Sequence, residues 1–240
     1  MKLLTTLQGF SPLSGCAVAL GYFDGVHRGH RAVLDAALAR KDLVPAVFTF
    51  SLSKGGLSPT GKQDGRLYPD GQRIRLLLDC GIRTVIIPPF AEIASMEKEE
   101  FAQLLCIQLG ARAVFCGEDY RFSRGAAAGV DELVSLCGGY GVSVTALPPV
   151  WYAGERVSST RVRALLRSGD VDLAGRLLGR PYTLDMLVET GQQLGRRLGF
   201  PTINQSFLPG MVMPRYGVYA TRARIGDTVF PGVFVQEGAF

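Results

Sequence analysis

Residues 21–30 read Gly-Tyr-Phe-Asp-Gly-Val-His-Arg-Gly-His, and they contain both histidines of the chain, His27 and His30. The short apolar run 16–20 comes before them, and residues 31–40, which are rich in helix formers, come after them. The stretch is therefore expected to be a buried strand, a glycine-rich turn and the start of a helix.

A helix start behind a glycine-rich turn is a natural site for an anion. Glycines let the backbone approach a ligand closely, and the first N–H groups of the helix are unpaired and carry a partial positive charge. Histidines three positions apart share one face of the first turn, so both imidazoles can donate to the same phosphate chain. The alternative, two surface histidines without a ligand, is disfavoured by their pairing behind a buried strand.

The spacing His-x-Gly-His resembles the signature of the nucleotidylyltransferases, which transfer AMP or CMP and release pyrophosphate. The longer stretch resembles the Gly-x-Phe-Asp-Gly-x-His-x-Gly-His variant of one family, the bacterial bifunctional riboflavin kinases/FMN adenylyltransferases, also called FAD synthetases. The resemblance implies that His27 and His30 are catalytic. It also implies a set of residues that bind ATP or its phosphates: Gly21, Phe23, Asp24, Gly25 and Gly29.

Composition indicates a globular protein without membrane spans. The 240 residues are 47% hydrophobic and 20% charged, and no apolar run approaches the roughly 20 residues of a span. The first fifteen residues are too weakly apolar for a signal peptide, which predicts a cytoplasmic protein. The five cysteines are scattered, with no Cys-x-x-Cys pair, so they indicate neither a zinc site nor a disulfide framework.

The basic balance, a net charge of +5, fits either nucleic acid or a polyphosphate ligand. No block of five or more like charges occurs, which favours the polyphosphate and predicts no nucleic-acid partner. Arginines, whose forks suit phosphate oxygens, gather near expected loops and helix starts: Arg121, Arg124, Arg161, Arg163, Arg196 and Arg197.

Residues 16–147 alternate short apolar runs with amphipathic segments. Strands are expected at 17–20, 46–50, 84–87, 113–116 and 142–147, and helices at 29–40, 70–80, 97–109 and 130–138. In the second helix Asp70 is expected as the N-cap and Gly81 as the stop. Strands buried on both faces predict an α/β fold with a parallel, doubly wound, Rossmann-like sheet, whose ligands lie at the carboxyl ends of the strands.

The loop 117–125, Gly-Glu-Asp-Tyr-Arg-Phe-Ser-Arg-Gly, follows the fourth expected strand. Its aromatic residues can equally be core anchors. The loop resembles the Gly-x-Asp-Phe-Arg-Phe-Gly loop of the family, which lines the nucleotide and flavin pocket. The resemblance implies nucleotide contacts at Gly117 and Asp119 and flavin contacts at Phe50, Arg121 and Phe122.

A second helix start lies at 157–163, Val-Ser-Ser-Thr-Arg-Val-Arg. Either serine can be a simple N-cap, and hydroxyls with free N–H groups also make a second phosphate cradle. The stretch resembles the Ile-Ser-Ser-Thr-x-Ile-Arg motif of the family. The resemblance implies phosphate binding by Ser158, Ser159 and Thr160 and a catalytic role for Arg161 in steadying the leaving pyrophosphate.

Gly179 and Pro181 mark a domain boundary, which divides the chain into 1–180 and 181–240. Strands at 182–190, 216–225 and 228–235 predict a partial antiparallel β-barrel. The loop 191–204 is a long hairpin loop or a nucleotide loop, and it resembles Gly-x-x-x-Gly-Arg-x-Leu-Gly-Phe-Pro-Thr-Ala-Asn of riboflavin kinases. The resemblance implies nucleotide contacts at Gly191, Gly195, Arg196, Gly199 and Pro201, and Mg²⁺ ligation by Thr202 and Asn204.

Two departures from the family pattern carry expectations of their own. The family has an acid-Pro-His-Pro element near the flavin where this chain has Ser-Leu-Ser-Lys at 51–54, which predicts weaker flavin affinity. The sequence also ends at Phe240, inside the kinase domain and before the catalytic glutamate of the family. We therefore expect the 240-residue chain not to phosphorylate riboflavin.

The first hypothesis is transfer of AMP from ATP to FMN, giving FAD and pyrophosphate, with Mg²⁺ bridging phosphates. It requires the two helix starts at 27–30 and 157–163 to converge on one triphosphate. An adenylyltransferase with another phosphorylated acceptor, and a non-catalytic flavin or nucleotide sensor, stay open as alternatives. The oligomeric state is not predicted.

Overall fold

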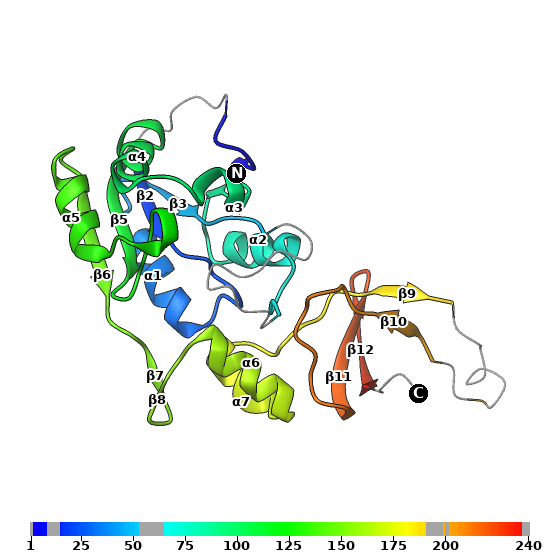
Figure 1. Cartoon of the computed structure of the whole chain (residues 1–240). Coiled ribbons are helices and arrows are strands. Elements are labelled where there is room, and N and C mark those ends of the chain that lie inside the picture. The colour runs from blue at the N-terminus through cyan, green and yellow to red at the C-terminus, as the bar shows by residue number, and fades with distance from the viewer. Residues whose placement is uncertain (1, 9–14, 53–64, 191–198, 200–201, 237–240) are drawn as a thin grey trace.

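The computed structural model describes residues 2–8, 15–52, 65–190, 199 and 202–236. A parallel sheet with helices on both faces forms the larger part of the chain (Figure 1). Antiparallel strands near the C-terminus stand to one side of that sheet. The predicted fold class is therefore confirmed.

The six strands of the parallel sheet follow the order β1-β4-β3-β2-β5-β6, and every described pair is parallel. Five of them match the predicted strands within a few residues. The first, β1, was missed; it pairs with β4 at one edge. Their bounds are β1 Lys2–Leu4, β2 Cys16–Leu20, β3 Val44–Phe48, β4 Thr84–Ile86, β5 Ala111–Gly117 and β6 Ser143–Leu147.

Helices cover both faces of the sheet because successive side chains of a strand point in opposite directions. Val18 of β2 packs in a core with Phe101 and Leu105, whereas its neighbour Ala19 packs in a second core with Leu34 and Leu77. The elements involved are α1 Arg28–Ala39 and α2 Asp70–Asp79 on one face, and α4 Lys98–Gln103, the π-helical turn Leu104–Gln108 and α5 Val130–Gly138 on the other. Such winding on both faces is what the sequence predicted.

The start of α2 differs from the prediction. Pro69, not Asp70, is the N-cap residue, and it offers no side-chain cap. Asp70 lies in the first turn and accepts from the guanidinium of Arg73 at 2.8 Å. The predicted stop at Gly81 fits its left-handed backbone, with φ +103°.

After β6 the chain forms a short hairpin and two helices, β7 Trp151–Tyr152, β8 Glu155–Arg156, α6 Ser159–Ser168 and α7 Val171–Leu178. A third core joins these helices to the rest, and it contains Leu67, Tyr68, Val162 and Leu166. The remaining short helices are α3 Phe90–Ile93 and the 3₁₀ turn Arg124–Ala126.

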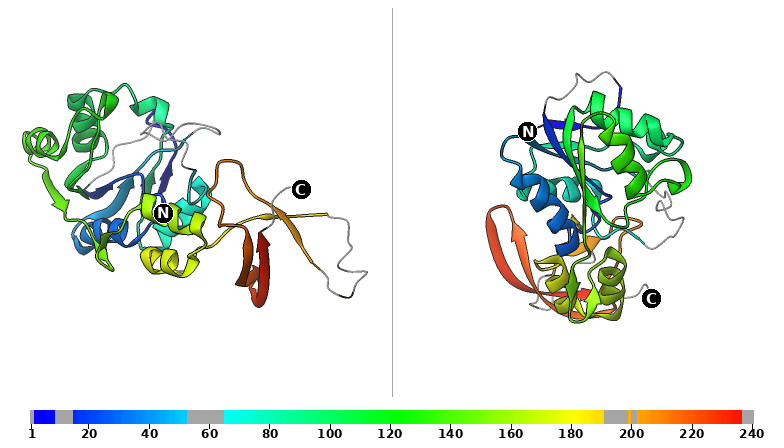
Figure 2. Two further views of the ribbon diagram at one scale, coloured as in Figure 1. Left: turned by 60° about the horizontal axis from the view of Figure 1, so that its bottom comes forward. Right: turned by 90° about the vertical axis from the view of Figure 1, so that its left-hand side faces the viewer.

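The described residues of the C-terminal region form two antiparallel pairs rather than one continuous sheet (Figure 2). β9 Leu187–Glu189 pairs with β10 Asn204–Ser206, and β11 Gly217–Ile225 pairs with β12 Thr228–Gln236. β9 is shorter than the predicted strand 182–190, and β10 was not predicted. The long hairpin β11–β12 confirms the two predicted strands at 216–225 and 228–235.

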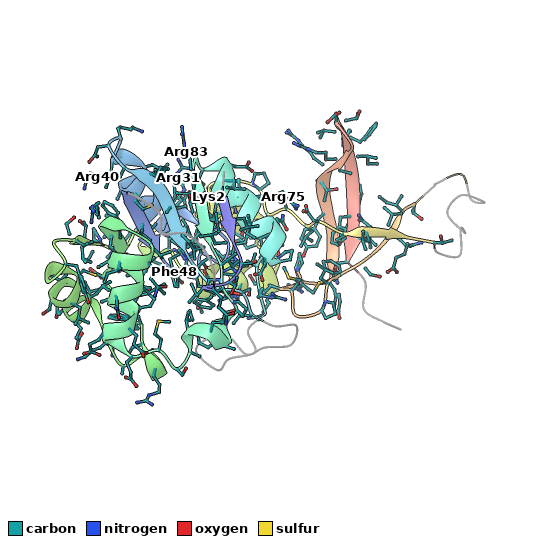
Figure 3. All side chains as sticks on the ribbon, turned by 90° about the horizontal axis from the view of Figure 1, so that it is seen from above. Lys2, Arg31, Arg40, Phe48, Arg75 and Arg83 are labelled. Carbon is teal, nitrogen blue, oxygen red and sulfur yellow. The ribbon has the colours of Figure 1, made fainter. Side chains whose placement is uncertain are left out.

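The distribution of buried and exposed side chains is that of a globular protein, as the composition predicted. Phe48 lies inside the fold, whereas Arg40 and Arg83 lie at its rim (Figure 3). All five cysteines are free, and four are buried, as expected for small apolar residues. Within the described ranges, none of the helices has both the length and the apolar character needed to cross a bilayer.

Candidate active site

The turn between β2 and α1 lies at the carboxyl end of the central strand, where a doubly wound sheet binds its ligands. His27 is the N-cap residue of α1, and its Nδ1 accepts from the backbone N–H of His30 at 3.2 Å. The two imidazoles stack, with ring centroids 3.7 Å apart and planes 13° from parallel. The two histidines therefore form one unit, as their spacing predicted.

Burial and nearby arginines keep both imidazoles neutral. The pKa of His27 is lowered to about 4, first by burial and then by the charges of Arg163, Arg156 and Arg180. Burial also holds the pKa of His30 well below its ordinary value. Because Nδ1 of neutral His27 is an acceptor, its proton lies on Nε2, which is its only donor. Nδ1 of His30 is buried and has no partner among the described residues.

Stability is expected to fall in acid because of these histidines. Above pH 6.5 His27 is neutral in both folded and unfolded chains; between pH 6.5 and about 4 only the unfolded chain gains the proton. Since each pH unit is worth about 1.4 kcal/mol, the free energy of unfolding should drop by about 3 kcal/mol across this range. Urea denaturation at pH 7 and at pH 4.5 measures the drop.

The matched variant for that measurement is His27→Asn, because asparagine also caps helices but does not titrate. Its free energy of unfolding should depend less on pH over the same range. A wild-type stability that stays constant between pH 7 and 4.5 would contradict the neutral, buried imidazoles.

Phe23 packs against His30, and Gly21 lies next to Phe23. The ring of Phe23 is 1% exposed and meets the His30 ring edge-on, with centroids 5.2 Å apart. A Cβ added to Gly21 would lie 3.1 Å from the Phe23 ring, so a larger residue here would push against that ring. Both were predicted to contact ATP. The geometry gives them a packing role under His30, and their contact with ATP stays a prediction.

The buried carboxylate of Asp24 connects the histidine turn to residues from other parts of the chain. It is 1% exposed and accepts from the backbone N–H groups of Leu67 and Tyr68. It also pairs with the guanidinium of Arg163 on α6 at 2.5 Å. The oxygens of this side chain are thus already occupied by protein donors. Its predicted contact with phosphate stays a prediction.

The start of α6 meets this same turn. The Oγ of Ser159 donates to the backbone carbonyl of Asp24 at 2.7 Å, and Ser158 caps the helix by accepting from the N–H of Arg161. On the other side, a Cβ added to Gly29 would lie 3.1 Å from the His27 ring and 3.5 Å from the carbonyl of Val157. The two helix starts are thus neighbours, as the first hypothesis required.

Arg161 and Arg163 point to different partners. Arg161 donates to the carbonyls of Tyr152 and Glu155 and pairs with the Glu155 carboxylate at 3.1 Å, so it holds the β7–β8 hairpin. Arg163 instead reaches the carboxylate of Asp24 in the histidine turn. The catalytic role that the family resemblance implies for Arg161 stays a prediction. Arg163, which the sequence analysis named only among the arginines suited to phosphate, lies four positions after Ser159 and shares its face.

Arg73 is an arginine of this region that the sequence analysis did not single out. Its side chain is 1% exposed. Its guanidinium donates to the carbonyls of Tyr22 and Phe50 and to the hydroxyl of Thr49. It therefore ties together the chain segments that leave β2 and β3.

Three half-buried aromatic rings gather at the ends of these strands. Phe50 stacks on Tyr22 with centroids 4.9 Å apart and contacts Phe90 at 5.0 Å. The guanidinium carbon of Arg73 lies 4.4 Å from the centroid of the Tyr22 ring. Phe50 was a predicted flavin contact; Tyr22 and Phe90 were not predicted.

The loop after β5 is held mainly by contacts within the protein. Asp119 pairs with Arg156 at 2.5 Å, and the guanidinium of Arg121 donates to the carbonyls of Ala126 and Ala127. Phe122 is 6% exposed and packs against Phe101 in the core. The ligand contacts predicted here, including that of Gly117 at the end of β5, stay predictions.

Most of the predicted kinase loop lies outside the described residues, namely Gly191, Gly195, Arg196 and Pro201. Gly199 and Thr202 are exposed, and Asn204 begins β10 opposite Glu189. In the part of the chain that the structure describes, no group of three His, Cys, Asp or Glu side chains is arranged to hold a metal ion.

Two family models match the chain, FAD synthetase over residues 10–161 and riboflavin kinase over residues 178–237. The second match means that the chain carries a riboflavin kinase domain. A crystal structure called a macrolide-efflux protein from Streptococcus pneumoniae has a TM-score of 0.84 and 29% identity, covering 96% of this chain and 77% of that one.

Curated relatives agree with the family models. The bifunctional riboflavin kinase/FMN adenylyltransferase of Escherichia coli K12 is 34% identical over 97% of this chain and 77% of its own length. The protein of the same name from Bacillus subtilis is 30% identical over 90% of this chain and 70% of its own length. The histidine unit, the adjoining serine-rich helix start and these matches together place the chain in the bifunctional riboflavin kinase/FMN adenylyltransferase family.

Proposed function

We propose that this protein transfers the AMP moiety of ATP to FMN, which yields FAD and pyrophosphate. The observation that carries the proposal is the meeting of the two helix starts at the Asp24 turn, where Ser159 touches the backbone of Asp24. Two helix starts side by side offer unpaired N–H groups and positive partial charge to one triphosphate. The names of the relatives support FMN as the acceptor.

The chemistry asks the protein for positioning and charge neutralisation. A phosphate oxygen of FMN forms a bond to the α-phosphorus of ATP, while the bond from that phosphorus to the pyrophosphate oxygen breaks. His27 and His30 donate to the α-phosphate as neutral imidazoles. The hydroxyl of Thr160 and the backbone N–H groups at the start of α6 hold the phosphates that leave, since the hydroxyl proton of Ser159 is already donated to the Asp24 carbonyl.

The rings of Tyr22, Phe50 and Phe90 favour a flat aromatic acceptor. Half-buried rings at the ends of β2 and β3 offer a stacking surface of the kind that an isoalloxazine uses. This cluster supports FMN over an acceptor without an aromatic ring system. The altered segment 51–66 raised the alternative of another phosphorylated acceptor, and residues 53–64 of that segment lie outside the described residues.

Mg²⁺ is a proposed cofactor, and the described side chains would supply few of its ligands. Asp24 already pairs with Arg163, so phosphate oxygens would provide most ligands in the adenylyl-transfer site. In the kinase domain Thr202 and Asn204 offer the neutral oxygens that Mg²⁺ accepts, and Glu189 lies opposite Asn204. When bound, Mg²⁺ neutralises phosphate charge.

The boundary between the two domains is proposed near residue 180. It is supported by the end of α7 at Leu178 and by the left-handed Gly179, with φ +74°. The riboflavin kinase match over residues 178–237 supports a kinase domain after this boundary. A cytoplasmic location stays a prediction.

The test is incubation of the purified chain with ATP, Mg²⁺ and one acceptor, followed by chromatography. With FMN we expect FAD and an equal amount of pyrophosphate. Parallel reactions with pantetheine phosphate and nicotinamide mononucleotide should give no adenylylated product. Tight binding of ATP or flavin without release of pyrophosphate would instead support a non-catalytic sensor.

A further inference from the structure

The histidine turn holds a backbone conformation that its own residues disfavour. Phe23 and Val26 have positive φ, +54° and +42°. Left-handed backbone is costly for side chains with a Cβ and most of all for a β-branched residue. Contacts from elsewhere in the chain must therefore hold this turn in the shape that places His27 and His30.

Arg180 makes such contacts at Val26, one of the two residues with positive φ. Its guanidinium donates to the carbonyl of Gly25 at 2.6 Å and to that of Val26 at 3.1 Å. A third bond, to the carbonyl of Leu178 at 3.1 Å, fixes the guanidinium at the end of α7. Its central carbon also lies 5.4 Å from the centroid of the Tyr68 ring.

Tyr182, two residues later, ties the other side of the turn. Its hydroxyl lies 3.0 Å from the carbonyl of Leu67 and 3.2 Å from that of Val212. The N–H of Leu67 in turn donates to the Asp24 carboxylate. The segment 180–182 therefore reaches the histidine turn by two routes, one direct and one through Leu67.

Both residues lie outside the region that matches FAD synthetase. That match ends at residue 161, whereas the riboflavin kinase match begins at 178. The support of the adenylyl-transfer turn thus includes residues that fall within the riboflavin kinase match, at the boundary of the two domains.

We propose that Arg180, in the segment where the two domains meet, is a positioning residue for adenylyl transfer, because its guanidinium fork holds the Gly25 and Val26 carbonyls. The inference rests on the proposed function. It means that the adenylyl-transfer site of this protein is complete only with the residues at the domain boundary in place.

The direct test compares FAD formation by the full chain and by Arg180→Ala. Loss of the two bonds to the turn should lower kcat about tenfold, the equivalent of one charge-assisted hydrogen bond. KM for ATP should change much less, because Arg180 contacts the turn and not the substrate. The matched control is Arg176→Ala, which removes an exposed arginine on α7 and should leave kcat unchanged.

Arg180→Lys separates the fork from the charge. Lysine keeps the positive charge but lacks the planar pair of donors, so kcat should stay several-fold below wild type.

The second readout is NMR titration of the imidazoles, which is simple because the chain has only two histidines. Charges facing them are Arg73 on α2, Arg156 on β8, Arg163 on α6 and Arg180.

The pKa of both histidines should rise in Arg180→Ala and stay near the wild-type values in Arg180→Lys. A kcat of Arg180→Ala equal to that of wild type would overturn the inference. If the alanine variant fails to fold, Arg180→Lys and Tyr182→Phe, each expected to lower kcat several-fold, decide instead. If wild type makes no FAD, the proposed function fails, and unchanged imidazole pKa values in Arg180→Ala would still count against the contact.

Discussion

Replacing His30 with alanine should lower the rate of FAD formation by at least tenfold. Its Nδ1 is buried without a described partner, and its ring is held between His27 and Phe23. A buried polar atom without a partner is costly, which indicates that a ligand completes its hydrogen bonding. Loss of a hydrogen bond to a charged phosphate costs roughly 1.5–3 kcal/mol, or about 10–150-fold in rate.

Steady-state rates with ATP and FMN measure the effect, and His30→Gln is the conservative comparison because its amide retains a donor. The glutamine variant should lose less activity than the alanine variant. Urea denaturation of both variants shows whether they remain folded. An unchanged rate in folded His30→Ala would remove this imidazole from the site.

The central sheet was readable from the sequence because its strands are buried on both faces. Residues 16–20 form one unbroken apolar run, and every one of them is at most 2% exposed. Such runs, separated by amphipathic segments, have few other interpretations. The short edge strand β1 carries no comparable pattern, since Lys2 and Leu3 are exposed and only the pairing with β4 makes it a strand.

The histidine unit was also readable, because its parts are three residues apart and the helix brings them together. Contacts between residues far apart in sequence could not be predicted in this way. Asp24 pairs with an arginine 139 positions away and with the N–H of Leu67, 43 positions away. Arg73 is buried for the same reason: the carbonyls that it binds come from the ends of two other strands. No local sequence pattern in α2 indicates that its arginine binds those carbonyls.

Replacing Asp24 with asparagine should destabilise the fold more than any other single change of charge considered above. The carboxylate is 1% exposed and the Arg163 side chain 12% exposed, so removal of the negative charge leaves a buried guanidinium unpaired. Breaking a buried ion pair in this way costs about 3–5 kcal/mol. The two N–H groups of Leu67 and Tyr68 also lose a charged acceptor.

Urea denaturation measures the loss, and Asp35→Asn is the matched control. Asp35 also pairs with an arginine, Arg31, but both side chains are about half exposed, so the same substitution should cost less than about 1 kcal/mol. Adding Arg163→Met to Asp24→Asn should recover part of the lost stability, because the uncompensated charge is removed. Equal losses for Asp24→Asn and Asp35→Asn would mean that the buried pair does not anchor the turn. Adenylyl transfer should fall together with stability in Asp24→Asn, since the same carboxylate holds the turn that carries His27 against the start of α6.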